Sequence, residues 1–246
     1  MKAVRNPGGD DGLLGVPALR VGGLVRFSST DWPGKLAAVL FLQGCPWHCG
    51  YCQNPHLLPA HGAQDEDWAA TLAWLATRRC LLDAVVFSGG EPTAQPELDA
   101  AIRAVRALGF AIGLHTGGAY PRRLVEVARE VDWIGLDIKA PLLAYESVTG
   151  VPRSGFAAFA SLDLVLKAGV AFEVRTTVHP ALTPPATLVT LARELAQAGV
   201  VRWVLQAFQP TGCANEALRA AAPHGVQIDV GTVATLKGYV PEIVVR

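Results

Sequence analysis

The sequence predicts an α/β fold whose parallel β-sheet forms a partial, open barrel of six βα units. Short apolar segments alternate with amphipathic helical segments along most of the chain. Three predicted helices end at a glycine, namely Gly109, Gly169 and Gly199, and an apolar segment follows each at once. Because strand–helix–strand units connect with a right-handed crossover, their strands run parallel. A complete barrel needs eight units in roughly 250 residues. The 246 residues show only six, so an open barrel is favoured over the alternative, a doubly wound sheet.

The composition indicates a large hydrophobic core and argues against nucleic-acid binding. Hydrophobic residues make up 51% of the chain, and 21 basic side chains balance 21 acidic ones, so no excess positive charge is available for a phosphate backbone. No apolar segment approaches the roughly 20 residues of a membrane span, and the N-terminal residues lack the apolar stretch of a signal peptide. We therefore expect a cytoplasmic protein with no membrane partner. Residues 1–18 predict a flexible arm, and residues 19–246 a single domain with a short C-terminal extension.

The first half of the chain contains an edge segment and the first four strands of the barrel. Residues 20–30 predict an edge strand or hairpin, and in the turn that follows Pro33 fixes φ and Gly34 accepts a positive φ. Residues 36–42 are continuously apolar, as expected of a strand covered on both faces. The next elements are a helix at 67–79, a strand at 84–88, a helix at 94–108, a strand at 110–115, a helix at 121–130 and a strand at 133–138.

The second half repeats the pattern after a looser segment at 140–154. A helix that ends at Gly169 is followed by a strand at 170–178. Thr183 predicts the N-cap of the next helix, with Pro184 at the first helical position. A strand at 200–208, a last helix at 213–222 and short strand-like pieces near the end complete the chain.

Three cysteines follow the first predicted strand at once. Cys45, Cys49 and Cys52 have the spacing C-x₃-C-x₂-C, so their thiolates can converge on one metal centre. A structural zinc takes four protein ligands and a cubane iron–sulfur cluster has four irons, so three cysteines leave one position open. The alternative is a closed zinc site with His48 or His56 as the fourth ligand. The other cysteines, Cys80 and Cys213, are interpreted as structural.

Polar residues also follow the other five strands, and in parallel βα folds these exits meet at one rim where ligands bind. Each group alone has a structural explanation, such as an ordinary turn or a structural ion pair. Together they predict a ligand site beside the cysteines and favour an open metal centre over a closed zinc site. The groups are Ser88-Gly89-Gly90-Glu91-Pro92, His115-Thr116-Gly117-Gly118, Asp137 with Lys139, then Arg175, Thr177 and His179, and finally Gln206, Phe208 and Gln209.

These residues resemble a known family. The cysteine spacing, with Tyr51 directly before the third cysteine, and the Gly89-Gly90-Glu91 motif resemble the radical S-adenosylmethionine (SAM) superfamily. The chain from residue 20 to residue 213 resembles in particular the activating proteins of anaerobic ribonucleoside-triphosphate reductase. The segments that carry this resemblance are residues 29–35, 43–55, 115–118, 135–139 and 174–180.

The resemblance implies two cofactors, a [4Fe–4S] cluster and SAM. Cys45, Cys49 and Cys52 would hold the cluster, and its open iron would be chelated by the amino and carboxylate groups of SAM. The residues implied for SAM are Glu91 with the backbone of Gly89 and Gly90 at the methionine ammonium, Tyr51 at the adenine, Asp137 and Lys139 at the carboxylate and ribose, and Thr116, Arg175 and His179 in the same cavity. In related activases an acidic residue precedes the threonine and is associated with a monovalent cation; here that position is His115, so no cation site is predicted.

The resemblance also implies the reaction and its partners. A flavodoxin- or ferredoxin-like donor would reduce the cluster, and SAM would be cleaved to a 5′-deoxyadenosyl radical. That radical would take a hydrogen atom from a glycine of a glycyl radical enzyme, with the large subunit of anaerobic ribonucleotide reductase as the first candidate. No catalytic residue is predicted beyond the cluster and SAM ligands. The alternatives are a radical SAM enzyme acting on a small molecule or another protein, and a non-catalytic zinc-binding module.

Overall fold

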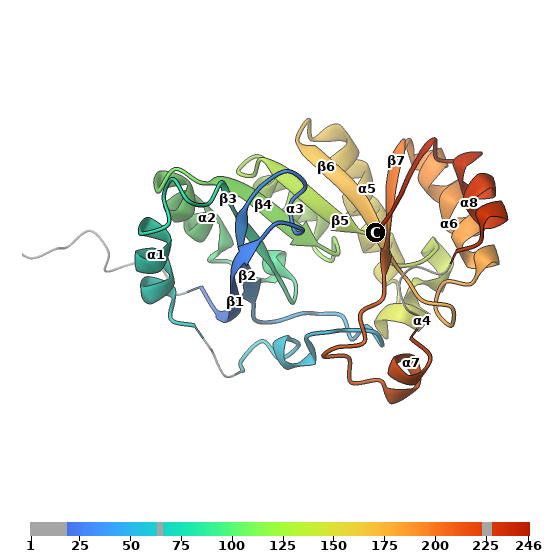
Figure 1. Cartoon of the computed structure of the whole chain (residues 1–246), viewed down its shortest axis with the longest axis horizontal. Coiled ribbons are helices and arrows are strands. Elements are labelled where there is room, and N and C mark those ends of the chain that lie inside the picture. The colour runs from blue at the N-terminus through green and yellow to red at the C-terminus, as the bar shows by residue number, and fades with distance from the viewer. Residues whose placement is uncertain (1–18, 63–65, 223–227) are drawn as a thin grey trace, which may run out of the picture.

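A single sheet of eight strands forms the centre of the computed structural model (Figure 1). The structure describes residues 19–62, 66–222 and 228–246, so the arm predicted for residues 1–18 lies outside the described residues. The strands are neighbours in chain order; β1 pairs antiparallel with β2, and every later pair is parallel. They are β1 (Val21–Ser28), β2 (Ala37–Leu42), β3 (Ala84–Gly89), β4 (Ala111–Thr116), β5 (Trp133–Asp137), β6 (Ala171–Val178), β7 (Arg202–Ala207) and β8 (Glu242–Val245).

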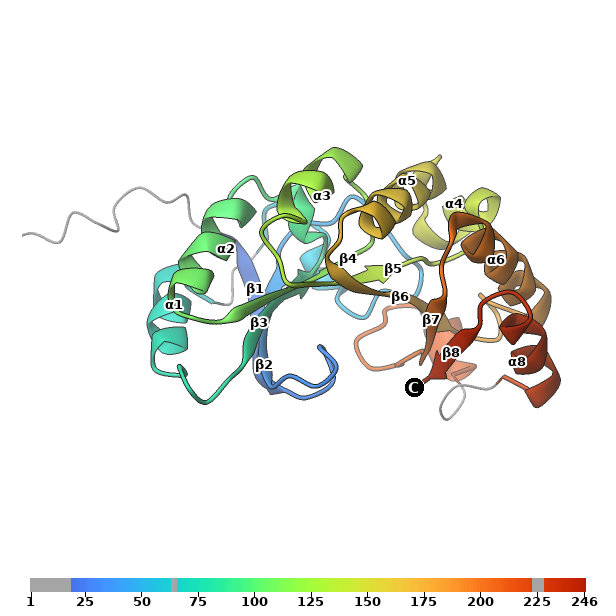
Figure 2. The ribbon, with the colours of Figure 1, turned by 90° about the horizontal axis from the view of Figure 1, so that it is seen from above.

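The sheet curves into an open arch, and α2, α3, α5 and α6 lie on its convex face (Figure 2). Within the described residues, no helix is both long enough and apolar enough to cross a membrane. The helices are α1 (Trp68–Ala76), α2 (Leu98–Ala107), α3 (Pro121–Val127), α4 (Tyr145–Thr149), α5 (Ser154–Lys167), α6 (Pro185–Ala198), α7 (Glu216–Ala220) and α8 (Val230–Lys237). Short 3₁₀ turns follow β2, β3 and β5; they are η1 (Pro55–Leu57), η2 (Pro92–Ala94) and η3 (Leu142–Ala144).

The two faces of the sheet bury two separate hydrophobic clusters. Leu40, Phe87 and Ile134 point to the convex side and pack in the large cluster with the helices. The residue before each of them belongs to a small cluster on the concave side. Because successive side chains of a strand point to opposite faces, strands that are apolar throughout supply both clusters. This explains why β2 and β3 read as continuous apolar runs in the sequence.

Two tryptophans fill the concave face at the amino-terminal half of the strands. Trp32, from the connection between β1 and β2, stacks on Trp133 with ring centroids 5.5 Å apart and an angle of 17° between the planes. Gly113 of β4 lies against the stack, since a Cβ atom there would be 2.9 Å from the Trp32 ring. Ser88, His115 and Asp137 come later on their strands and line a cavity. The apolar stack therefore forms the floor beneath a polar site.

The six predicted parallel strands are β2 to β7, and the predicted edge strand is β1. The tail adds more than the short pieces expected, because α8 leads into β8, which pairs parallel with β7. Among the residues of α8 only Leu236 is buried, so its sequence lacks an amphipathic stripe. The one local signal is Asp229, whose side chain accepts a hydrogen bond from the Thr232 N–H and caps the helix.

The prediction that Thr183 caps the next helix is wrong. The helix α6 begins at Pro185, with Pro184 at the cap position and no side-chain cap. The Thr183 hydroxyl instead accepts a hydrogen bond from the His179 N–H and donates one to the His179 carbonyl. Thr183 therefore closes the turn after β6. Its hydroxyl is used in these two hydrogen bonds and is not available to cap the helix. The looser segment at 140–154 also contains regular structure, η3 and α4.

We predict that Gly113→Ala destabilises the fold, because the added methyl group enters the space of the Trp32 ring. Overpacking of this kind costs about 1–3 kcal/mol, which urea unfolding would measure as a lower midpoint. Gly23→Ala is the matched control in a strand, since its Cβ would meet nothing closer than 3.8 Å. Equal midpoints for the two variants would contradict the close packing at the floor.

Candidate functional site

A cavity of about 620 Å³ opens at the carboxyl ends of the strands. It brings together most of the residues singled out in the sequence, although they are spread over more than a hundred positions. Those that line it are Cys45, Cys49, Tyr51, Cys52, Gly89, Gly90, Glu91, Asp137, Lys139 and Arg175. Thr116 and His179 do not line it. The rim of the parallel sheet therefore forms one site, as the strand exits predict.

The start of the cysteine loop is held by backbone hydrogen bonds to η1 and the residue after it. The N–H of Gly44 donates to the Leu57 carbonyl at 2.7 Å, and that of Cys45 donates to the Leu58 carbonyl at 3.1 Å. All three cysteines are free thiols. Burial raises the pKa of Cys45 to about 12 and also raises the pKa of the other two thiols. The thiols therefore stay protonated at neutral pH until a metal displaces their protons.

The donor set fits an iron–sulfur cluster better than a single ion. Across the ranges that the structure describes, no three His, Cys, Asp or Glu side chains are grouped to hold one metal ion. Each thiolate of a cubane cluster binds a different iron, so cluster ligands share a cavity without meeting at one point. His48 and His56 are both exposed and neither lines the cavity. The zinc alternative thus lacks its fourth ligand.

A late segment of the chain clamps the outer side of the cysteine loop. A Cβ atom on Gly212 would lie 2.2 Å from the Gln53 carbonyl oxygen, and φ of Gly212 is +82°. Next to it, the Cys213 thiol lies 3.7 Å from the carbonyl oxygen of Gly50. Cys213 is buried, whereas Cys80 is exposed and lies outside the cavity. Cys213 thus has the structural position expected of it.

The double glycine after β3 is required by the packing of the chain on itself. A Cβ atom would lie 2.2 Å from the Leu42 nitrogen at Gly89, which has φ +107°, and 2.3 Å from the Gly44 carbonyl oxygen at Gly90. The Glu91 N–H donates to the same Gly44 carbonyl at 2.8 Å. The sequence predicted that these glycines let the backbone approach a ligand. In the structure they let the backbone pack against Leu42 and Gly44, at the start of the cysteine loop.

The Glu91 carboxylate is buried and held only by neutral donors. It accepts hydrogen bonds from the Thr93 hydroxyl at 2.6 Å, the Thr116 hydroxyl at 2.7 Å and the Gly117 N–H at 3.0 Å. No cationic side chain of the described residues forms an ion pair with it. Thr116 acts here as a support for Glu91 rather than as a wall of the cavity. A cationic group of a ligand would thus meet a negative charge that these neighbours leave uncompensated.

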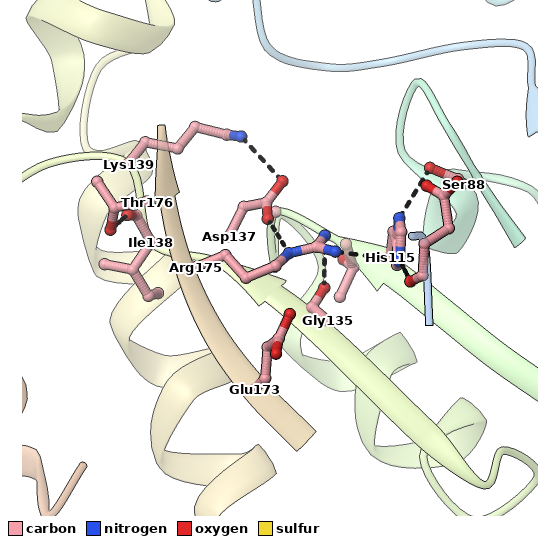
Figure 3. A network of polar contacts seen from close by, with 12 residues as sticks. Ser88, His115, Gly135, Asp137, Ile138, Lys139, Glu173, Arg175 and Thr176 are labelled. Atoms are coloured by element: carbon pink, nitrogen blue, oxygen red, sulfur yellow. Dashed lines mark hydrogen bonds and ion pairs between the residues drawn. The ribbon is translucent and has the colours of Figure 1, made fainter. Parts of the chain in front are cut away.

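Another part of the cavity lining, at the ends of β5 and β6, carries an excess of positive charge (Figure 3). Asp137 accepts from Arg175 Nε at 2.8 Å and lies 3.7 Å from Lys139 Nζ, so one carboxylate serves two cations. Burial opposes a charge on Lys139, but Tyr51 and Asp137 outweigh it and raise the pKa of the ammonium well above its usual range. The ammonium also lies 5.6 Å from the centre of the Tyr51 ring. This corner suits an anionic group of a ligand.

His115 lies in the same network as a neutral ring. Its Nε2 is 2.8 Å from the Asp31 carbonyl oxygen and 3.0 Å from Arg175 Nη1, and its Nδ1 is 3.3 Å from the Ser88 hydroxyl. Burial and the adjacent guanidinium lower the pKa of His115 to about 3. At the end of β4 the chain thus holds an uncharged ring beside a fixed cation.

His179 is not brought into the site. The strand β6 ends at Val178, so the alternation that predicted a shared face for Arg175 and His179 ends one residue too early. Both ring nitrogens of His179 have partners elsewhere, the Leu218 carbonyl at 3.1 Å and the Ala181 N–H at 3.1 Å. Its ring packs edge-on against Phe208. We therefore leave His179 out of the proposed ligand set.

The cavity also has lining residues that the sequence did not predict. Asp31 and Trp47 line the cavity from a turn and from inside the cysteine spacing, and Arg246 reaches it from the end of the chain. Arg246 forms an ion pair with the buried Glu173 on the concave face. The position of Trp47 within the cysteine loop was an available signal, whereas nothing local connects Arg246 with β6.

Comparisons with known proteins show which family the chain resembles. Residues 39–195 match the family model of the radical SAM superfamily. A protein of Methanocaldococcus jannaschii with the provisional name glycyl-radical enzyme activating enzyme is 27% identical over 92% of this chain and 95% of its own length. The pyruvate formate-lyase-activating enzyme of Clostridium pasteurianum is 30% identical over 67% of this chain and 70% of its own length. A structure of TYW1 with a lysine–pyruvate adduct shares the fold, with 16% identity and a TM-score of 0.60 over 83% of this chain and 74% of that one.

We predict a pH dependence of stability that His115 causes. An unfolded histidine titrates near pH 6.5, whereas the folded ring stays neutral down to about pH 3. Between these values the unfolded chain binds one proton more, so the free energy of unfolding falls as the pH falls, by about 1.4 kcal/mol per pH unit at most. The variant His115→Gln should lack this part of the slope in urea unfolding between pH 6.5 and 4. Parallel slopes for the two proteins would contradict the assignment.

Proposed function

The chain belongs to the radical SAM superfamily, and we propose that it is the activating enzyme of a glycyl radical enzyme. As a radical SAM enzyme it uses a [4Fe–4S] cluster and SAM as cofactors. The proposal about its partner is supported by similarity to two proteins named as activating enzymes, one of them along nearly the whole of both chains. The non-catalytic zinc module considered above is wrong, because the family is enzymatic.

One observation carries the assignment of the ligand site. The cavity places three free thiols together with the uncompensated Glu91 carboxylate and the cationic pair Lys139 and Arg175. An amino acid in its zwitterionic form has the complementary charges, an ammonium and a carboxylate. We propose that Glu91 meets the ammonium of SAM, that Lys139 meets its carboxylate, and that the face of Tyr51 lies toward the adenosine part.

Within this proposal the residues bind and orient, and none transfers a proton. When bound, the cluster and SAM supply reductive cleavage of the sulfonium and a radical that can take a hydrogen atom. Asp137 keeps its charge, because Arg175 and Lys139 outweigh the effect of burial and lower the pKa of its carboxyl group. It can therefore accept hydrogen bonds from ribose hydroxyls while it fixes both cations. The hydroxyls of Thr93 and Thr116 donate hydrogen bonds to the Glu91 carboxylate and so fix its position.

We propose the large subunit of anaerobic ribonucleotide reductase as the partner and a flavodoxin- or ferredoxin-like protein as the electron donor. The partner proposal is supported by the segments around Trp32, the cysteines and Asp137, which resemble the activating proteins of that reductase. The two remaining cysteines, one exposed and one buried against Gly50, offer no ligands for a second cluster within the described residues. This favours an activase over radical SAM enzymes that carry auxiliary clusters.

The function is tested by mixing the anaerobically reconstituted protein with SAM, dithionite and the candidate reductase. Electron paramagnetic resonance should then detect a glycyl radical on the reductase, and its Gly→Ala variant at the radical position should give none. Cleavage of SAM without any radical on the reductase would refute this partner and favour the alternative, a radical SAM enzyme with a small molecule or another protein as substrate.

We predict that Cys49→Ala abolishes cluster assembly, because it removes one of the three proposed iron ligands, all of which line the cavity. Iron and sulfide content after anaerobic reconstitution measures the effect. The control is Cys80→Ala, an exposed thiol outside the cavity, which should leave the iron content unchanged. Equal iron loss in the two variants would show that the ligands are assigned wrongly.

We predict that Lys139→Ala weakens SAM binding and leaves the cluster intact. Loss of a charge-assisted hydrogen bond costs about 1.5–3 kcal/mol, which corresponds to a roughly 10- to 100-fold higher Kd. Calorimetric titration of the cluster-loaded protein with SAM measures it. The control is Lys167→Ala on the exposed face of α5. An unchanged Kd in Lys139→Ala would remove this residue from the site.

A further inference from the structure

Tyr145 is a buried side chain that the proposed function leaves unexplained. It is the first residue of α4 and is 0% exposed. Its hydroxyl accepts a hydrogen bond from the Lys139 N–H at 2.9 Å and lies 3.3 Å from the Asp137 carbonyl oxygen, to which it donates. The hydroxyl thus binds the backbone of the two residues whose side chains form the charged corner of the cavity.

The end of β5 depends on this side chain because its sheet pairing runs out there. The last ladder bond runs from the Ile138 N–H to the Arg175 carbonyl at 2.9 Å. One residue later the Lys139 N–H has the Tyr145 hydroxyl as its partner instead of a strand. A buried N–H must be paired, so the tyrosine takes over where the sheet stops. The directions of the Asp137 and Lys139 side chains follow from the backbone held in this way.

The ring of Tyr145 reaches the cysteine loop. It packs edge-to-face against Trp47, with ring centroids 5.7 Å apart, and Trp47 lies between Cys45 and Cys49 in the chain. The Trp47 ring is also close to Gly117, where a Cβ atom would come within 2.5 Å of it. The Trp47 indole is therefore fixed between the exit of β4 and Tyr145. Tyr145 in turn contacts both the cysteine loop and the end of β5.

The backbone of α4 strengthens the same connection. The carbonyls of Val148 and Thr149 accept hydrogen bonds from the N–H groups of Gly50 and His48, at 3.1 and 2.8 Å. These donors lie on the exposed part of the cysteine loop. A displacement of α4 would thus move the loop that carries Cys49 and, through Tyr145, the backbone at Lys139.

We propose that Tyr145 is a positioning residue. It fixes the spacing between the cysteine loop and the segment from Asp137, the last residue of β5, to Lys139. Its hydroxyl holds the backbone of Asp137 and Lys139, which are proposed to bind SAM. Its ring packs on Trp47 in the cysteine loop. The proposal rests on the assignment of the SAM site, but not on the identity of the partner enzyme. Tyr145 is not a catalytic residue, because it does not line the cavity and its hydroxyl is occupied by the backbone.

Two substitutions separate the two roles. Tyr145→Phe removes only the hydroxyl, and we expect a roughly three- to tenfold higher Kd for SAM, the range for one lost hydrogen bond, with unchanged iron content. Hydrogen–deuterium exchange of the cluster-loaded protein without SAM should show faster exchange at the Lys139 amide. Tyr145→Leu also removes the ring, and it should lose iron in addition. Thr71→Val is the matched control, because it removes a buried hydroxyl of α1 that donates to the Asp67 carbonyl at 2.8 Å; Thr71 does not line the cavity, so the variant should change neither the Kd nor the exchange at Lys139.

A double variant tests whether Tyr145 acts through Lys139. If it does, adding Tyr145→Phe to Lys139→Ala raises the Kd for SAM less than it does in the native chain, because the cost of the two changes is shared. Unchanged SAM affinity and unchanged Lys139 exchange in Tyr145→Phe would overturn the proposal, as would equal iron loss in the Phe and Leu variants. All these measurements are made without a partner enzyme. A failed glycyl radical assay therefore refutes the proposed function and leaves this inference standing.

Discussion

The site depends on a backbone-to-backbone contact between the exits of β2 and β3. Gly89 and Gly90 leave no room for a side chain against Leu42 and Gly44, and the Glu91 N–H binds the Gly44 carbonyl. The first cysteine follows Gly44 directly. This contact therefore sets the distance between the thiols and the carboxylate, and any side chain at either glycine would separate them.

Two carboxylates of the cavity, Glu91 and Asp137, differ in the kind of group that surrounds each of them. Glu91 is surrounded by hydroxyl and amide donors, which hold its position without cancelling its charge. Asp137 lies between two cations and is outnumbered by them. The two carboxylates thus produce different environments in one cavity, one suited to an ammonium and one to a carboxylate. Such preorganised groups bind a zwitterion without having to rearrange.

The cysteine loop is completed by parts of the chain that follow it by about a hundred residues or more. The α4 segment binds His48 and Gly50 on one side, and Gly212 and Cys213 cover it on another. Figure 1 shows the loop and α7 along the same edge of the molecule. A short loop has little stability of its own, because fixing each residue costs backbone entropy. The later connections of the barrel supply the contacts that order it.

The sequence by itself determined the strand order, the cysteines and most of the rim, because these follow from local periodicity, from glycine stops and from spacing within one segment. It failed where a side chain's direction or partner comes from elsewhere in the chain. His179 lies outside the site because β6 ends at Val178. The strand β8 is recognisable only from its pairing with β7. The tertiary structure alone decided that Thr116 supports Glu91, that the double glycine meets Gly44, and that Tyr145 joins the cluster loop to β5. These contacts link residues distant in sequence, and no local pattern encodes which backbone group a buried side chain will meet.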